Sequence, residues 1–330
     1  MKYCSRCVFS ENFPGITFDS NNICNYCTSD IRTDNNKRNE YLVKFEKLIA
    51  DTRNKSGYDV IMAYSGGKDS TYTMLLLSRK YRLKILAWTL DNGFLAKEAL
   101  DNISRMTRAA GAESVVFRPA FETMKDLFHV SATEDFYASK TLDRASTICT
   151  TCIGIVKSMV LKTAIEKRIP VAAFGWSPGQ APISSAIMQA GPSIQQFTNR
   201  SVRDPLVLRV PASSQFFLND NEMQTRKELW PVNVHPLAFM DYNEGDILQY
   251  IESYGWKKPS DTDSNSTNCL LNPLAVHLHK LKYGFHPYEW EIAGIVRSGS
   301  MPRQEGLEKI TAPLNTEAVK SAAEKIGLKL

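Results

Sequence analysis

The stretch DVIMAYSGGKDSTYTM, residues 59–74, decides the fold. A short apolar run typical of a buried strand passes directly into two adjacent glycines and then into a segment compatible with a helix. Adjacent glycines adopt backbone conformations that other residues avoid, and they let a ligand come close to the main chain. Backbone N–H groups beside a helix N-terminus hold anions, and Lys68 adds a positive charge. The stretch therefore predicts a phosphate or pyrophosphate site at the end of a strand.

Strand and helix patterns alternate along the chain around this stretch. We expect strands at residues 59–64, 84–90, 114–119 and 170–175, helices at about 70–81, 96–110 and 153–167, and a helical stretch ending near 128. A further strand, turn and helix is expected at 232–255. Short apolar runs separated by helices predict an α/β fold with an open parallel sheet covered on both faces. Ligands of such sheets bind beyond the carboxyl ends of the strands, where residues 65–70 lie.

The remaining segments suggest a division of the chain into four parts. Residues 1–35 are poor in aliphatic side chains, residues 36–56 predict an amphipathic connecting helix, residues 57–272 form the α/β unit, and residues 273–330 predict a helical C-terminal region. Residues 177–230 carry Pro, Gly, Ser and Gln without a clear period. We expect long loops or a lid over the active face there.

The composition is that of a globular protein. Hydrophobic residues make up 43% and charged residues 23% of 330, and the net charge of +5 permits contact with RNA or an anionic metabolite without requiring either. No stretch approaches the roughly 20 apolar residues of a membrane span, and the N-terminus lacks the apolar core of a secretory signal. We therefore expect a cytoplasmic protein without a membrane partner, and a homodimer is compatible with the sequence.

Four cysteines near the N-terminus have the spacing of a metal site. Cys4 and Cys7 form one C-x-x-C pair, and Cys24 and Cys27 form a second. Two such pairs predict a four-thiolate zinc ribbon, and the metal would organise a segment that lacks a core of its own. Cysteines with another purpose remain the alternative. The sequence leaves open whether the ribbon contacts RNA or only braces the chain.

The other three cysteines are Cys149, Cys152 and Cys269. Cys149 and Cys152 precede a helix expected to begin near Ile153, whose N-terminus would favour their thiolates. A C-x-x-C pair plus one distant cysteine matches the ligands of a [4Fe-4S] cluster in which one iron lacks a protein thiolate. A disulfide-exchange pair and unrelated structural cysteines remain alternatives.

The segment SGGKDS resembles the PP-loop of the ATP pyrophosphatases, which have an adenine nucleotide alpha hydrolase-like fold. It does not have the Walker A spacing. The resemblance implies that ATP with Mg²⁺ is cut between its α and β phosphates, that a substrate oxygen is adenylated, and that a nitrogen or sulfur nucleophile then displaces AMP. It assigns ATP contacts to the whole loop, with Lys68 and Asp69 catalytic: Ser65, Gly66, Gly67, Lys68, Asp69 and Ser70.

Two weaker matches follow later strands. TLDNGF resembles the segment that flanks the adenosine in this family, with Asp91 as the candidate contact. A role of Asp91 as a helix cap or turn residue is an equally good interpretation. FGWSPG stands where many relatives have Gly-His-Asn, and only Gly175 matches. Roles assigned to the other residues of that motif do not transfer to this chain.

The three distant cysteines resemble those of the [4Fe-4S]-dependent PP-loop thiolases that make 2-thiouridine in tRNA. In that group the pair follows the third strand and the single cysteine follows a Pro-Leu strand and its helix, an order that HPLAFMDYNEGDILQYIESYG and Cys269 reproduce. The resemblance implies that Cys149, Cys152 and Cys269 are catalytic, that the open iron holds sulfide, and that a sulfur donor and tRNA are candidate partners.

The two ends of the chain resemble a different branch, the N-acetyl sugar amidotransferases. Residues 1–27 and 279–310 carry this likeness. Together with the PP-loop and the Cys149 pair it reaches most of the chain and is more extensive than the likeness to the thiolases. The resemblance implies ammonia from a glutaminase partner and amidation of a sugar carboxylate. Cys269 departs from that family, which has Tyr after the Thr-Asn. We therefore predict ATP-dependent sulfur insertion into a nucleobase, in tRNA or free, or into a small carbonyl metabolite, with the amidotransferase as the alternative.

Overall fold

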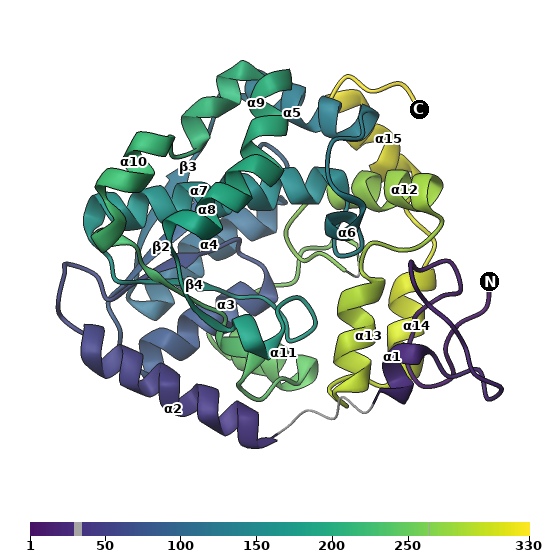
Figure 1. The fold of residues 1–330 in the computed structure, drawn as a ribbon, viewed down its shortest axis with the longest axis horizontal. Coiled ribbons are helices and arrows are strands. Elements are labelled where there is room, and N and C mark those ends of the chain that lie inside the picture. Colours follow the sequence, from purple (N-terminus) through teal and green to yellow (C-terminus); the bar gives the residue numbers. More distant parts are fainter. Residues whose placement is uncertain (30–34, 264) are drawn as a thin grey trace.

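The computed structural model describes residues 1–29, 35–263 and 265–330. Within that part of the chain a six-stranded sheet has the order β3-β2-β1-β4-β6-β5 (Figure 1). Its strands are β1 (Val60–Ala63), β2 (Ile85–Leu90), β3 (Glu113–Phe117), β4 (Val171–Phe174), β5 (Ile187–Gln189) and β6 (Val232–Val234). Neighbouring strands are parallel except for β5, which pairs antiparallel with β6. The predicted α/β class is confirmed, with β5 as a departure from a purely parallel sheet.

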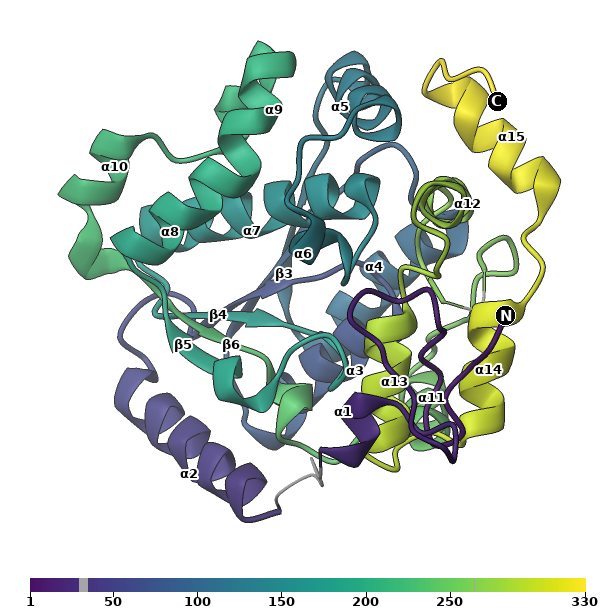
Figure 2. The same ribbon diagram turned by 45° about the vertical axis from the view of Figure 1, so that its right-hand side comes forward.

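Two helical layers cover the sheet. One layer contains α2 (Asn35–Thr52), α3 (Lys68–Leu75), α4 (Lys97–Ala110) and α11 (Glu244–Ser253), and the other contains α5 (Phe121–Thr133), α7 (Thr147–Lys167), α12 (Asn272–Tyr283) and α15 (Thr316–Lys325) (Figure 2). Along β1, Val60 and Met62 pack in the first layer and Ile61 in the second. Burial on both faces explains why this strand is apolar throughout instead of alternating.

Helix α7 begins at Thr147, six residues before the predicted start near Ile153. Its N-cap is Ser146, whose side chain accepts a hydrogen bond from the backbone N–H of Cys149 at 3.1 Å. The early β-branched residues conceal this start, because they lower helix propensity. Cys149 and Cys152 therefore lie within the first two turns of the helix and not ahead of it.

Helix α7 is a long helix of 21 residues with an apolar middle part. Among the described residues it is the one helix long and apolar enough to cross a membrane, by length and composition alone. Of its most apolar window, 56% is buried inside the protein. Its apolar character is accounted for by this burial, since Ile155 and Val160 belong to the core on one face of the sheet.

Residues 177–230 do not form the long loops that the sequence predicts, because most of the segment has secondary structure. The segment contains β5, α8 (Pro192–Thr198), η3 (Asn199–Arg203), α9 (Asp204–Arg209), η4 (Pro211–Phe216), α10 (Asp220–Thr225) and η5 (Lys227–Leu229). Prolines start several of these short pieces, so no helical period extends far enough to be recognised in the sequence. Leu218, Met223 and Trp230 pack against Leu161 and Ile165 of α7.

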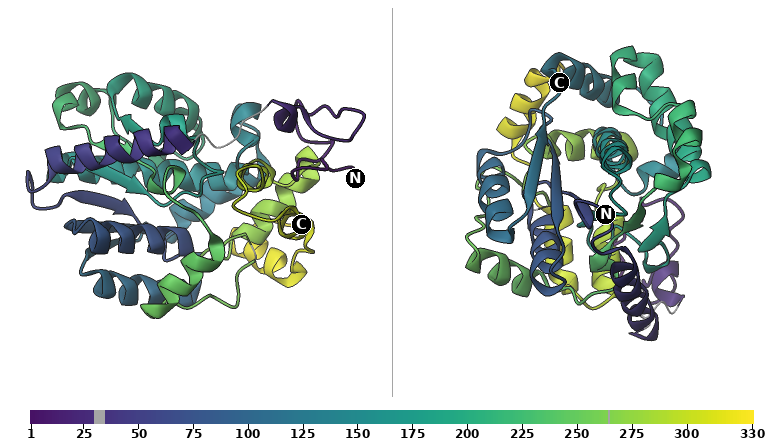
Figure 3. Two further views of the ribbon diagram at one scale, coloured as in Figure 1. Left: turned by 90° about the horizontal axis from the view of Figure 1, so that it is seen from below. Right: turned by 90° about the vertical axis from the view of Figure 1, so that its left-hand side faces the viewer.

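The N-terminal segment packs on residues 285–310 (Figure 3). Phe9 and Phe13 lie against Trp290 of α13 (Glu289–Arg297). Arg303, at the start of α14 (Arg303–Thr311), donates from Nε to the carbonyl oxygens of Cys4 and Cys7 at 2.9 and 3.0 Å. The predicted boundary at residue 35 adjoins residues 30–34, which lie outside the described residues.

Candidate active site

The SGGKDS loop, residues 65–70, lies between the end of β1 and the start of α3. Gly66 has a φ of 76°, and a Cβ atom there would lie 2.5 Å from the carbonyl oxygen of Ala99. The indole N–H of Trp256 donates to the carbonyl oxygen of Gly66 at 2.9 Å. These contacts hold the loop at the carboxyl end of β1, where the strand order reverses between β1 and β4. Ligands bind at this position in open α/β sheets.

Hydroxyl groups contact the amides of the loop. The N–H of Gly67 donates to Ser65 Oγ at 3.3 Å, and the N–H of Lys68 donates to Thr267 Oγ1 at 3.1 Å. The hydroxyls of Ser65 and Ser70 are 3.1 Å apart. These N–H and O–H donors gather at the N-terminus of α3, an arrangement that suits phosphate oxygens.

An ion network occupies the other side of the loop. Lys68 Nζ lies 2.9 Å from both oxygens of Asp69 and 2.9 Å from the hydroxyl of Tyr242. Glu244 is 3.8 Å from Lys68 and accepts from Lys309 of α14 at 3.2 Å. Burial alone would lower the pKa of Lys68, but Asp69, Tyr242 and Glu244 raise it well above its usual value. Lys68 therefore remains a cation beside the loop.

Gly175 lets the end of β4 approach the loop. A Cβ atom on Gly175 would lie 2.5 Å from Cα of Ser70. The match of this glycine to the family pattern thus coincides with a close backbone approach. Any contact of Gly175 with a nucleotide remains a prediction.

Asp91 lies beside this site but outside the cavities described below. Its carboxylate accepts from the N–H of Gly93 at 3.1 Å and from Arg118 Nε at 2.7 Å. The neighbouring Asn92 lines the larger cavity and donates to Cys152 Sγ at 3.4 Å. The adenosine contact of Asp91 remains a prediction.

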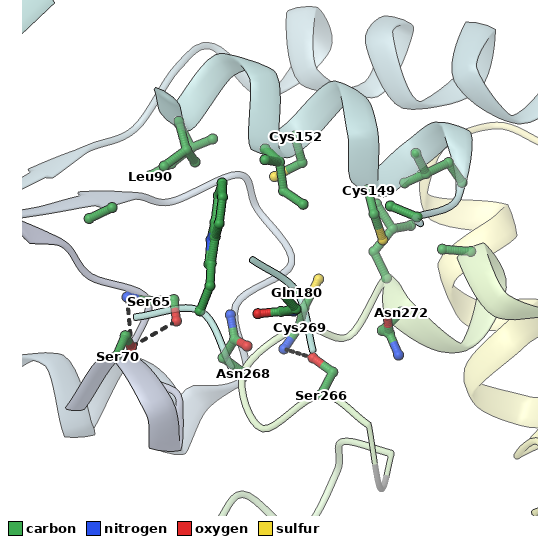
Figure 4. Close-up of a pocket in the computed structure, with 18 of the residues that line it drawn as sticks. Ser65, Ser70, Leu90, Cys149, Cys152, Gln180, Ser266, Asn268, Cys269 and Asn272 are labelled. Carbon is green, nitrogen blue, oxygen red and sulfur yellow. Dashed lines mark hydrogen bonds between the residues drawn. The ribbon is translucent and has the colours of Figure 1, made fainter. Parts of the chain in front are cut away.

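The three distant cysteines meet at one cavity of about 290 Å³, which we call the thiol chamber. Cys149 and Cys152 share one face of α7, and Cys269 comes from the loop on the other side (Figure 4). A β-bridge between Leu95 and Cys269 fixes that loop against the segment after β2. Ser65 and Ser70 line the same chamber, so its wall continues into the SGGKDS loop.

Burial changes the expected chemistry of these thiols. The sequence predicts that the helix N-terminus favours thiolates, but burial raises the pKa of Cys149 and Cys269 and raises that of Cys152 to about 11. The charged form is unfavourable in this enclosed space unless a cation compensates it. The expectation of low pKa values is therefore wrong for the protein without a bound metal group.

The chamber fits a cluster better than a single ion. Among the described residues, the three sulfurs do not lie within 4.8 Å of one another, in contrast to the four N-terminal sulfurs. Thiolates of a [4Fe-4S] cluster bind separate irons and need more space than thiolates on one ion. Arg144 and Lys157 also line the chamber and offset thiolate charge, and burial lowers the pKa of Lys157 to about 8.

A second cavity of about 280 Å³, the loop pocket, adjoins the thiol chamber. Lys68, Asp69, Glu244 and Lys309 line the loop pocket. The residues common to both cavities are Ser65, Ser70, Ile153, Gly175, Trp176, Gln180, Ser266, Asn268, Tyr288 and Glu291. The ion network and the three thiols therefore face neighbouring parts of one site.

Sequence reasoning missed Glu291 of α13. Its carboxylate accepts from Ser177 Oγ at 2.7 Å, and it lines both cavities. Burial raises the pKa of Glu291 to about 7, and Asp69 contributes to the rise. No local motif surrounds it. The only sequence signal is an acidic residue within the apolar helical pattern EWEIAGIV.

The four N-terminal cysteines form a separate, compact group. Cys4 and Cys27 sulfurs are 3.9 Å apart, and Cys7 and Cys24 sulfurs are 3.7 Å apart. Four thiolates at about 2.3 Å from a tetrahedral ion are separated by about 3.8 Å. Cys4 Sγ also accepts backbone N–H groups of Arg6, Cys7 and Cys24 at 3.4, 3.5 and 3.2 Å. The group fits a single tetrahedral ion.

Comparison with known proteins gives distant likenesses. No family model matches the chain. An uncharacterized protein from Methanocaldococcus jannaschii is 23% identical over 329 residues, which is 99% of each chain. The U34-tRNA thiolase NcsA from Methanococcus maripaludis, solved with its [4Fe-4S] cluster, is 15% identical with a TM-score of 0.37, covering 100% of this chain and 90% of that chain.

Two synthetases show similar levels of likeness. NMN synthetase from Francisella tularensis is 10% identical with a TM-score of 0.40, over 89% of this chain and 97% of that chain. An NH3-dependent NAD synthetase from Campylobacter jejuni is 16% identical with a TM-score of 0.32, over 45% and 59%. Likenesses this distant assign neither a function nor the role of any residue.

Proposed function

We propose that this protein is an ATP-dependent sulfur-insertion enzyme. It adenylates a carbonyl oxygen of its substrate, releases pyrophosphate, and then replaces the oxygen with sulfur as AMP leaves. The observation that carries this proposal is the position of Cys269. It faces Cys149 and Cys152 across a chamber whose wall continues into the SGGKDS loop.

The adenylation half of the reaction rests on the loop and its ion network. Amides and hydroxyls of residues 65–70 bind the phosphates that leave as pyrophosphate. Lys68 stabilises the negative charge that develops on this leaving group, and the Mg²⁺ that enters with ATP adds to this effect. Tyr242 and Asp69 fix the position of the Lys68 ammonium.

The sulfur half rests on the thiol chamber. Cys149, Cys152 and Cys269 would hold a [4Fe-4S] cluster, and this group would supply the sulfide that replaces the oxygen. Apolar side chains, including Trp88, Leu90 and Phe174, line the same space. They limit the access of water, which would otherwise hydrolyse the adenylate.

The N-terminal cysteines hold a structural zinc in this proposal. Zinc thiolate sites with four cysteines leave no position open for a substrate. The group packs against α13 and α14, which carry Glu291 and Lys309. We therefore assign the ribbon the bracing role that the sequence left open.

A competing function is the amidotransferase. The sequence likeness at residues 1–27 and 279–310 supports it, and these are the segments that pack on each other in the structure. In that reaction the activated carbon receives ammonia and Cys269 has no purpose.

An assay of nucleophile choice tests the proposal. Anaerobically prepared protein is given ATP and an acceptor, either uridine or unmodified tRNA, with labelled sulfide or labelled ammonia. We expect AMP, pyrophosphate and sulfur in the acceptor, and we expect Cys269→Ser to remove the sulfur product. Full activity of iron-free protein with ammonia, a glutaminase and a sugar carboxylate would contradict the proposal and favour the amidotransferase.

A further inference from the structure

Glu291 occupies the junction between the ATP side and the sulfur side of the site. It lines the loop pocket together with Lys68 and Asp69, and it lines the thiol chamber together with Cys149 and Cys269. The oxygen that is adenylated and the carbon that sulfur then attacks are bonded to each other, so both steps involve atoms close to the boundary between the two cavities. Glu291 is therefore a carboxyl group within reach of both steps.

Neighbouring groups fix the orientation of this carboxyl. Ser177 Oγ donates to Glu291 Oε1 at 2.7 Å, and the Gln180 side chain lies near the same carboxyl and opposes the rise in its pKa. Gln180 is itself fixed, because its Oε1 accepts from the backbone N–H of Ser177 at 3.1 Å. Gln180 lines both cavities, and Figure 4 shows it among the side chains of the thiol chamber.

The backbone around Glu291 is also tightly packed. A Cβ atom on Gly179 would lie 2.1 Å from the carbonyl oxygen of Glu291. Gly294, which is on α13 with Glu291, also faces Gly179. This close approach holds α13 against the loop after β4. The Glu291 carboxyl is therefore held in a defined position.

We propose, on the basis of the proposed function, that Glu291 is the general base of the adenylation step and that the substrate is a neutral cyclic amide. The N–H of such a ring stands beside the carbonyl that attacks ATP. Glu291 would take the proton from this nitrogen.

The step balances in atoms and electrons. As the N–H proton passes to the Glu291 carboxylate, the ring shifts to its imidate form and the carbonyl oxygen bonds to the α-phosphorus. The bond between the α-phosphorus and the bridging oxygen breaks, and pyrophosphate leaves with those electrons. When sulfur later replaces the AMP oxygen, the ring nitrogen regains a proton, which Glu291 can return.

A carboxylate substrate does not need this base. It reaches the site already ionised, so no proton has to leave it before its oxygen attacks ATP. The aromatic walls at Trp88 and Trp176 suit a planar neutral ring instead. The position of Glu291 thus favours a lactam substrate over the sugar carboxylate that an amidotransferase would use.

Charged and titratable groups surround Glu291 on several segments. Lys68 and Asp69 face it from α3, Glu244 of α11 and Lys309 of α14 line the same pocket, and Tyr288 precedes it in the chain. Arg144 and Lys157 line the thiol chamber beside it. Burial raises the pKa of Glu291 to about 7, with a further rise from Asp69 and an opposing effect of Lys68. Glu291 accepts a proton only when ionised, so adenylation should speed up as the pH rises through about 7.

Rapid-quench measurement of pyrophosphate release tests the inference. The holoprotein is mixed with ATP and uridine, unmodified tRNA or glucuronate. We expect release with uridine or tRNA and none with glucuronate, and the choice between uridine and tRNA identifies the source of the lactam. Glu291→Gln should slow release by about 100-fold or more and remove the rise with pH.

Two further variants make the result interpretable. Glu291→Asp keeps a base on a shorter side chain and should retain an intermediate rate with the pH dependence. Glu308→Gln, the same change at an exposed position of α14, should release pyrophosphate at the wild-type rate. Zinc content and melting temperature verify that each variant is folded.

Different negative results would overturn the role of Glu291, the substrate class or the proposed sulfur-insertion activity. Lactam-dependent release that Glu291→Gln leaves unchanged overturns the role of Glu291 while the proposed function stands. Release with glucuronate but not with uridine or tRNA overturns the substrate class and favours the amidotransferase. No release with any probe contradicts the proposed function and the inference together.

Discussion

The two cysteine groups of this protein differ in how they are assembled. Cys4, Cys7, Cys24 and Cys27 come from neighbouring turns, are largely buried, and lie close enough to share one ion. The thiol chamber takes two cysteines from one helix and a third from a distant loop, and its sulfurs face a cavity. The first group, which we call the closed group, surrounds a single ion position with its own sulfurs, as a structural metal site does. The second, which we call the open group, has space beside its sulfurs in which a substrate could react.

The largest expected effect concerns the closed group. We expect Cys24→Ser to lower the free energy of unfolding by at least about 5 kcal/mol, because the binding free energy of a structural zinc is about 10–16 kcal/mol. Chemical denaturation and zinc analysis measure this loss. A variant with normal stability and no zinc would remove the distinction between the two groups.

The open group should respond in the opposite way. We expect Cys269→Ser to abolish sulfur transfer while it changes the melting temperature little, because serine is similar in size to cysteine and the residue lines a cavity. Pyrophosphate release should persist, since the SGGKDS loop is intact. Loss of pyrophosphate release in a folded Cys269→Ser protein would show that adenylation at the SGGKDS loop depends on the thiol chamber, which contradicts this account.

A smaller effect is expected at the loop that joins ATP to the chamber. Gly66→Ala should destabilise the protein by about 1–3 kcal/mol and weaken ATP binding, because its φ is 76° and a Cβ would meet the Ala99 carbonyl at 2.5 Å. Gly111→Ala is the matched control, since Gly111 has a φ of 67° and nothing within 4 Å of an added Cβ. Equal ATP affinity in both variants would contradict this account of the loop.

The smallest effect concerns the contact between the closed group and the site. Glu289 accepts from the backbone N–H of Ser10 at 3.0 Å and from its hydroxyl at 2.9 Å. We expect Glu289→Gln to cost about 1 kcal/mol, because glutamine keeps one acceptor oxygen and loses the other. Zinc should remain bound while the rate of pyrophosphate release falls modestly. An unchanged free energy of unfolding would exclude this contact as the link between the two regions.

Sequence reasoning succeeded where the signal is local. The passage from β1 through Gly66 and Gly67 into α3 has its own strand, turn and helix pattern, and the spacing of the four N-terminal cysteines is contained within 27 residues. The parallel sheet also followed from local alternation. These features depend on backbone geometry that neighbouring residues determine.

The rest of the site depends on contacts that no local pattern reveals. Glu291 reaches the loop pocket only because Gly179 lets two backbones approach, and Cys269 reaches the chamber through its bridge to Leu95. The early start of α7 was hidden by β-branched residues, and the pairing of Asp91 with Arg118 joins the ends of two strands. Burial of the thiols, which reversed their expected pKa shift, also appears only in the folded chain.

The metal content of the intact chain tests the central claim most directly. Native mass spectrometry of protein prepared without oxygen should give one zinc together with about four iron and about four sulfide per chain. Cys269→Ser should lose the iron and sulfide and keep the zinc. Wild-type protein that holds zinc but takes up no iron after anaerobic reconstitution would contradict the account, as would iron retained in full by the Cys269→Ser variant.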